Sequence, residues 1–176
     1  MRITHYEETA LARFFFSNTK TSILWLVVRL YVGWEWLAAG WDKLHNPIWF
    51  GNNAGAALTG FVQGALGKTG GLHPDVAIWY ASFLQKYVLP HTNTWSNFVV
   101  IGELLVGIAL IAGIFVGISA FFGAFMNFNY LLAGTVSMNP IFFLLGVLLI
   151  LAWRVSGYIG LDYYILPKLH HLFKRK

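Results

Sequence analysis

Four charged side chains lie inside the long apolar stretches of this chain: Arg29, Glu35, Glu103 and Arg154. A charged group in hydrocarbon costs ~3 kcal/mol or more, so it is retained through an internal partner, a water-filled cavity or a ligand. Two interpretations follow. The charges pair as arginine and glutamate and fix the helix packing, or they line a polar pocket that binds a headgroup or moves protons. In the second case the two carboxylates are the candidate proton-handling groups.

The composition indicates an integral membrane protein. Of the 176 residues, 57% are hydrophobic and 11% are charged, whereas soluble proteins carry about 25% charged residues. The only charged residue between Trp95 and Trp153 is Glu103. This pattern excludes an ordinary soluble domain, a disordered chain and a nucleic-acid-binding protein, so the net charge of +5 is better explained by membrane orientation. The absence of cysteine excludes a disulfide, a thiolate nucleophile and a Cys-ligated cluster.

The apolar runs predict an all-α membrane protein, a single domain over residues 1–176 built as a four-transmembrane-helix bundle. A transmembrane helix needs roughly 20 predominantly apolar residues. The expected spans are residues 21–44, 95–116, 119–137 and 140–160. An amphipathic lead-in over residues 1–20 comes before them, and a basic tail over residues 161–176 follows.

A long insertion, residues 46–94, separates the first two spans. Its segment 54–67 is apolar but too short and glycine-rich to span, which favours a re-entrant or surface element. Residues 74–88 predict an interfacial helix with Pro74 in its first turn, ended by Pro90. We expect these short helices to form an extracytoplasmic lid on one membrane face.

Basic residues flank both ends of the chain and predict its orientation. With four spans the two termini lie on the same side, and the Lys and Arg excess makes that side cytoplasmic. The residues concerned are Arg2, Arg13, Lys20, Lys168, Lys174, Arg175 and Lys176.

The depths of the polar residues follow from the helical rise of ~1.5 Å per residue. Glu35 lies ~13 Å and Glu103 ~12 Å from the outer ends of their spans. Arg29 and Arg154 each lie ~10 Å from the cytoplasmic ends, and Asn127 falls between these layers or near the arginine layer. We therefore expect an interior that is acidic toward the outside and basic toward the cytoplasm.

Two stripes of small and polar residues run along single helix faces. The first is Arg29, Gly33, Trp36, Gly40 and Lys43; the second is Gly123, Asn127, Tyr130 and Gly134. Small residues let a neighbouring helix or a flat ligand approach closely, and close helix packing alone also explains the glycines. Lys43 and His45 lie at the predicted outer mouth. The histidines there lack helical metal-ligand spacing, so no metal site is predicted.

Three short motifs resemble the DoxX/DoxD family over roughly residues 22–165. The first is RLYVGWEWLAAGWDKL at Arg29–Leu44, in which Arg29, Gly33, Gly40 and Lys43 match the family's first helix. The others are GELLVG at Gly102–Gly107 and GYIGLD at Gly157–Asp162. The long insertion departs from the shortest DoxX proteins.

The resemblance implies a multi-pass protein of the bacterial inner membrane. DoxD-like members are the membrane subunit of thiosulfate:quinone oxidoreductase, which joins two thiosulfates into tetrathionate and passes electrons to quinone. For such an enzyme subunit the cofactor is quinone. The matched depths of Glu35 and Glu103 then make them candidate proton donors or relays, and the outer-mouth position of Lys43 and His45 makes them candidates to attract the sulfur anion. The residues expected to hold the quinone are Arg29, Trp36, Asn127 and Arg154.

Two further functions remain open at this point. The chain is alternatively a non-catalytic anchor or scaffold of a redox-homeostasis complex, recruiting a soluble redox or sulfur-transfer enzyme. A transporter or proton path is least supported, because spans one and two show no echo in spans three and four. The expected partners are membrane lipid, quinone, a second subunit and further copies of the chain.

Overall fold

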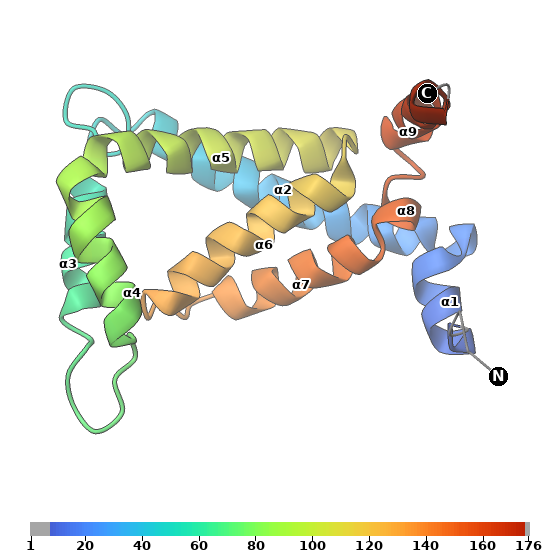
Figure 1. Cartoon of the computed structure of the whole chain (residues 1–176). Helices are drawn as coiled ribbons and strands as arrows, with labels where there is room; N and C mark the ends of the chain where they lie inside the picture. The colour runs from blue at the N-terminus through green and yellow to red at the C-terminus, as the bar shows by residue number, and fades with distance from the viewer. Residues whose placement is uncertain (1–7, 175–176) are drawn as a thin grey trace.

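The computed structural model describes the backbone of residues 8–174 and the side chains of residues 8–169. Within that part the chain is helical and contains no strand, which confirms the predicted all-α class. The helices that pack along one another are α2 (Ser22–Leu44), α5 (Thr92–Ala112), α6 (Val116–Leu132) and α7 (Asn139–Leu151) (Figure 1). The shorter elements are α1 (Ala10–Ser17), η1 (Thr19–Thr21), α3 (Ala56–Leu66), α4 (Ile78–Phe83), η2 (Leu84–Val88), η3 (Leu89–His91), α8 (Trp153–Ser156) and α9 (Asp162–Lys174).

Helices α2 and α5 lie side by side in close backbone contact (Figure 1). A β-carbon at Gly107 would lie 2.5 Å from the backbone nitrogen of Leu37, and one at Gly40 would lie 2.9 Å from that of Leu104. Such distances leave no room for any side chain at either position, because real β-carbons essentially never come so close. The two glycines therefore bring the backbones together, as small residues do between helices in membranes.

Helices α6 and α7 pack on each other beside this pair. A β-carbon at Gly146 would lie 3.0 Å from the β-carbon of Ala124, so these helices also approach closely. The turn between α5 and α6 is tight and uses two residues with left-handed backbone conformation, Gly113 (φ 71°) and Phe115 (φ 44°). The core that joins the helices includes Val32, Trp36, Val106, Leu110, Val116, Ala120, Leu149 and Val155.

Within the described residues, two helices have the length and composition to cross a membrane. They are the stretches Thr19–Leu44 and Ile78–Ala112, whereas α3, α6 and α7 are shorter apolar helices. The prediction of one uninterrupted helix over 140–160 is wrong, because α7 ends at Leu151. Beyond α8 the backbone bonds instead to the α5–α6 turn: Leu161 N donates to Ala112 O (3.2 Å) and Asp162 N to Gly113 O (2.8 Å).

The insertion folds across one end of the α2–α5 pair, where α3 and α4 lie together at the left of Figure 1. Most of the stretch 74–88, predicted to be helical, is helical, but its predicted start at Pro74 and its predicted end at Pro90 are wrong. Helix α4 starts at Ile78, and the helical path continues through η2 and η3 into α5. Pro90 lies in the first turn of η3, where its missing N–H leaves no hydrogen bond unmade.

Hydrogen bonds hold the insertion to α5 and to α6. Ser96 donates its hydroxyl to the carbonyl oxygen of Trp49. Tyr80 Oη donates to the carbonyl oxygen of Asn129 at 3.0 Å. After α3, Lys68 Nζ donates to the carbonyl oxygen of Gly134 at 2.7 Å. The insertion is thus fixed at several points along the bundle rather than loosely tethered at its two ends.

The segments at the chain ends form helices at the opposite end of the molecule (Figure 1). Residues 1–7 of the predicted lead-in lie outside the described part. The rest contains α1 and most of η1. Thr9 caps the N-terminus of α1 by accepting from Ala12 N (3.3 Å). Trp25 Nε1 donates to the carbonyl oxygen of Phe15 (2.7 Å), which ties α1 to α2. The predicted tail 161–176 contains α9. The first residue of α9, Asp162, has a buried carboxylate.

The close α2–α5 contact predicts opposite effects for two glycine substitutions on α5. Gly107→Ala would force a methyl group into the backbone of α2, and overpacking of this kind costs about 1–3 kcal/mol. The matched control is Gly102→Ala, whose added methyl would meet only the sulfur of Met126 at 3.3 Å. Thermal unfolding in detergent should show a lower midpoint for Gly107→Ala and an unchanged or higher one for Gly102→Ala. Equal midpoints would contradict the proposed contact.

Candidate functional site

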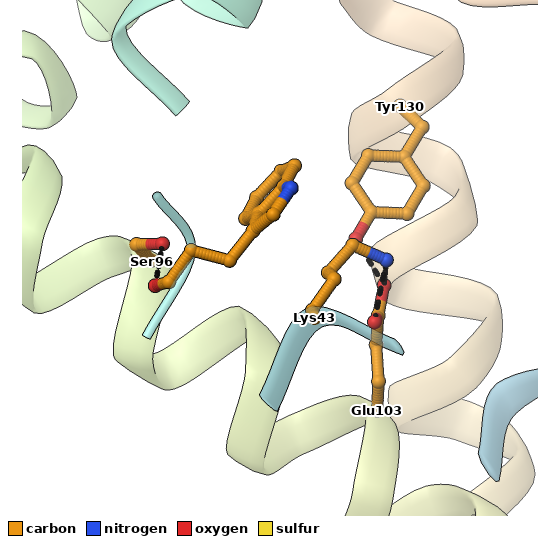
Figure 2. A network of polar contacts seen from close by, with 5 residues as sticks. Lys43, Ser96, Glu103 and Tyr130 are labelled. Carbon is orange, nitrogen blue, oxygen red and sulfur yellow. Dashed lines mark hydrogen bonds and ion pairs between the residues drawn. The ribbon is translucent and has the colours of Figure 1, made fainter. Parts of the chain in front are cut away.

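The described structure contains an ion pair between Lys43 of α2 and Glu103 of α5. Lys43 Nζ lies 2.7 Å from Glu103 Oε2 and 2.9 Å from Oε1. Tyr130 of α6 donates its hydroxyl to Oε1 at 2.9 Å. Figure 2 shows the lysine and tyrosine converging on the carboxylate from opposite helices. Three helices therefore meet at one carboxylate, and we call Lys43, Glu103 and Tyr130 the triad.

The antiparallel register of α2 and α5 produces this meeting. Gly33 faces Leu110, Leu37 faces Gly107, and Gly40 faces Leu104 and Glu103. Residues three apart on a helix lie on one face. Lys43 comes three residues after Gly40, so it continues the same face and reaches Glu103.

Burial makes the triad electrostatically strong. Glu103 is 1% exposed and Lys43 is 21% exposed, so the pair is largely removed from the screening of water. Lys43 Nζ also lies 5.3 Å from the centre of the Trp49 ring, within the range of a cation–π contact. The lysine charge thus has two partners, and the glutamate charge accepts from a lysine and a hydroxyl.

The triad lines a cavity of about 200 Å³, which we call the polar cavity. The residues that line it are Glu35, Trp36, Ala39, Lys43, Glu103, Asn127, Tyr130, Asn139 and Phe142. Five of the residues expected from the sequence to form a site meet here: Glu35, Trp36, Lys43, Glu103 and Asn127.

The amide of Asn127 is an unsatisfied group in this cavity. Asn127 is 1% exposed, and its Nδ2 has no hydrogen-bond partner. A buried donor left unpaired costs about 1–3 kcal/mol, so the site favours an occupant with a hydrogen-bond acceptor. Two carboxylates and one lysine line the cavity, so with all three charged its net charge is negative. An acceptor that carries no negative charge therefore suits it best.

Arg29 does not reach the polar cavity. It is 1% exposed, and its Nη2 donates to the carbonyl oxygen of Ile159 at 2.8 Å. Its guanidinium lies in a slot between Gly113 and Gly160, where a β-carbon on either glycine would collide with it. This arginine joins the segment before α9 to the α5–α6 turn.

Asp162 supports the same junction. Its carboxylate accepts from the backbone nitrogens of Phe115 (2.6 Å) and Val116 (2.9 Å) at the N-terminus of α6. A carboxylate at a helix N-terminus satisfies free N–H groups and interacts favourably with the helix dipole. This cap and Arg29 hold the α8–α9 segment against the bundle.

Two other expected site residues lie on the surface. Arg154 is exposed on α8, where its guanidinium lies 5.1 Å from the centre of the Trp153 ring. His45 is exposed at the end of α2, with its ring 4.5 Å from that of Trp41. Neither lines the polar cavity.

The sequence-based list of site residues omitted Tyr130 and Asn139. The signal for Tyr130 was available, because it lies three residues after Asn127 on the same small and polar face of α6. Its hydroxyl becomes a site group only through its bond to Glu103, which is 27 positions away in the chain. Asn139 begins α7, and its place beside the cavity depends on how α7 packs.

The chain matches the DoxD family, described as the TQO small subunit DoxD, over residues 24–176. All the residues of the triad and of the polar cavity fall within that range. No curated protein and no solved structure shows a significant match.

The unequal burial of the ion pair predicts unequal effects on stability. Lys43→Met leaves the buried Glu103 carboxylate without its cation, and breaking a buried pair in this way costs about 3 kcal/mol or more. Glu103→Gln should cost less, about 1–3 kcal/mol, because Lys43 retains contact with solvent. The double variant should recover part of the loss in chemical unfolding. Lys86→Met, at an exposed lysine, is the control, and strictly additive single effects would contradict the coupling.

Proposed function

The chain belongs to the DoxD family, the small subunit of thiosulfate:quinone oxidoreductase, and from this membership we propose that its polar cavity receives the quinone ring. The chain is thus a membrane subunit of a quinone oxidoreductase complex, with a partner subunit. The observation that carries the proposal is the unpaired amide donor of Asn127, buried in a cavity that also contains an ion pair.

The residues of the polar cavity fit a quinone ring in size and in chemistry. An apolar cavity of about 150 Å³ admits benzene, and the polar cavity measures about 200 Å³. A quinone is neutral and carries carbonyl acceptors, so Asn127 Nδ2 is suited to donate to one of them. Trp36 contributes an aromatic side chain to the lining.

Glu103 is well placed to handle protons in this cavity. Reduction of a quinone to its quinol consumes two protons, which the residues around the ring must deliver. Glu103 is bonded to Lys43 and Tyr130, both of which carry transferable protons. Glu35 also lines the cavity, so we propose that it is a second proton-handling group beside the triad.

The charge of the polar cavity favours a neutral quinone over the thiosulfate anion. Lys43 forms an ion pair with Glu103. Glu35 adds a second carboxylate to the lining, so negative charge is in excess when all three groups are charged. A sulfur dianion would be repelled there. We therefore revise the expectation that Lys43 and His45 bind thiosulfate, and propose that the partner subunit binds the anion while this chain binds the quinone.

The finer topology belongs to the same proposal. We propose that α2, α5, α6 and α7 cross the bacterial inner membrane, with the insertion as an extracytoplasmic lid and both termini in the cytoplasm. The outward faces of α5 and α6 carry exposed large apolar side chains, among them Phe98, Leu105, Ile118, Phe121 and Phe125. Exposed apolar surface of this extent is typical of contact with lipid.

Turnover of the complex tests the proton role of Glu103. The chain is purified with its partner subunit, reconstituted in nanodiscs and assayed for thiosulfate-dependent quinone reduction. Glu103→Gln should lower kcat by about 100-fold, since a positioned acid or base contributes about 10²–10⁴-fold. Asp42→Asn, at an exposed residue on α2, is the control that should retain full turnover.

Two outcomes of this assay would contradict the proposal. Full turnover of folded Glu103→Gln, with the partner still bound, would favour a non-catalytic scaffold. Asn127→Leu should raise KM for quinone, because it removes the proposed donor while roughly keeping the side-chain volume. An unchanged KM would exclude Asn127 from quinone binding.

A further inference from the structure

A second cavity, of about 230 Å³, lies between the insertion and the bundle. We call it the apolar cavity, because its lining is almost entirely apolar and largely aromatic. Its walls come from α3 and α4–η2 on one side and from α5 and α6 on the other. The lining includes Phe61, Val62, Phe83, Trp95, Val99 and Met126.

The polar groups around the apolar cavity already have hydrogen-bond partners within the protein. Tyr80 Oη donates to the backbone carbonyl and the side-chain oxygen of Asn129. Trp95 Nε1 donates to the carbonyl oxygen of Tyr87 at 3.0 Å, and Tyr130 donates to Glu103. The cavity therefore suits an occupant that makes no hydrogen bonds.

The apolar cavity is held open by the fold. The insertion has its own buried core, which includes Leu58, Val62, Ala65, Val76, Leu84 and Val88. The bonds of Tyr80 to Asn129 and of Ser96 to the Trp49 carbonyl fix this core against α6 and α5. The insertion thus packs on its own core and is bonded to α5 and α6 at these two points, with the apolar cavity between it and the bundle.

Tyr130 is a shared wall of the two cavities. Its side chain lines both of them. The ring packs edge-on against Phe61 of α3, with centres 6.1 Å apart, while the hydroxyl points at Glu103 (Figure 2). The two cavities therefore adjoin at this side chain, so a molecule with a polar ring and an apolar chain would reach both by passing around Tyr130.

The rim of the apolar cavity carries exposed aromatic side chains. Phe98 is 63% exposed and Phe125 is 53% exposed, and both line the cavity. They lie on the outward faces of α5 and α6, the faces that the proposed topology gives to lipid. An apolar chain in the bilayer would therefore find an entrance at this rim.

We propose that the apolar cavity binds the isoprenoid chain of the quinone whose ring occupies the polar cavity. This inference rests on the proposed function, and adds the site that selects a long-chain membrane quinone over a free ring. Its support is the apolar lining, the engaged polar groups and the position of Tyr130, which lines both cavities.

Filling the apolar cavity tests the proposal through the quinone side chain. Val99→Phe adds a ring to a half-buried lining residue, and Ile101→Phe adds the same ring to the exposed residue two positions along α5. Each variant complex is assayed in identical nanodiscs with an isoprenoid quinone and with the same ring lacking the chain. Because the membrane is the same, the partition of each quinone cancels between variants.

The expected result is a selective loss. Val99→Phe should raise KM for the isoprenoid quinone by about tenfold, the effect of losing the burial of roughly two methylene groups. KM for the chainless ring should stay unchanged, and Ile101→Phe should alter neither value. An equal rise for both quinones, or no rise for either, would overturn the chain site while leaving quinone turnover intact.

A binding measurement without turnover separates this inference from the proposed function. A quinone with a photoreactive diazirine on its isoprenoid chain is irradiated with the reconstituted complex, and the labelled peptides are sequenced. Labelling of residues 58–62, 80–99 and 125–130, reduced by excess unlabelled quinone, supports the proposal. Labelling elsewhere in the chain overturns it, as does equal labelling by a diazirine phospholipid that quinone does not displace. No competed labelling anywhere in the complex would overturn the proposed quinone function itself.

Discussion

The close contact between α2 and α5 is the constraint on which the rest of the structure depends. Glycines on both helices let the backbones touch at Leu37–Gly107 and Gly40–Leu104. Such contacts fix the helices lengthwise as well as sideways, because a shift of one residue would bring side chains into the gaps. That fixed alignment places Lys43 opposite Glu103. The site is therefore a consequence of how the two helices lock together.

The buried charged residues form two groups with different roles. At one end Arg29 and Asp162 are buried in backbone contacts, closing the segment before α9 onto the α5–α6 turn. Near the insertion, Glu103 accepts from two side chains beside a cavity with an unpaired amide. The Asp162 carboxylate is fully engaged within the fold, whereas Arg29 bonds through Nη2 and keeps Nε and Nη1 buried without a hydrogen-bond partner. What distinguishes Glu103 is that it lines the polar cavity, which Arg29 does not, and this position makes it the group suited to a ligand.

Tyr130 connects the polar chemistry to the surrounding apolar surface. Its hydroxyl belongs to the triad, and its ring belongs to the wall under the insertion. A tyrosine combines an apolar body with a polar tip, so one residue can separate two environments and touch both. The insertion forms one wall of the apolar cavity. The departure of this chain from the shortest DoxX proteins therefore lies beside the cavities.

The sequence by itself determined the helical class, the long first span and the residues with chemical potential, because apolar period and buried charge are local properties of the chain. Glu35, Trp36, Lys43, Glu103 and Asn127 were singled out in this way, and the structure places all five around one cavity. Only the tertiary structure decided which charges meet. It paired Glu103 with a lysine rather than an arginine, ended α7 early, and carried α4 through Pro90 into α5. Those outcomes depend on contacts between residues far apart in the chain, which the spacing of residues along one helix does not specify.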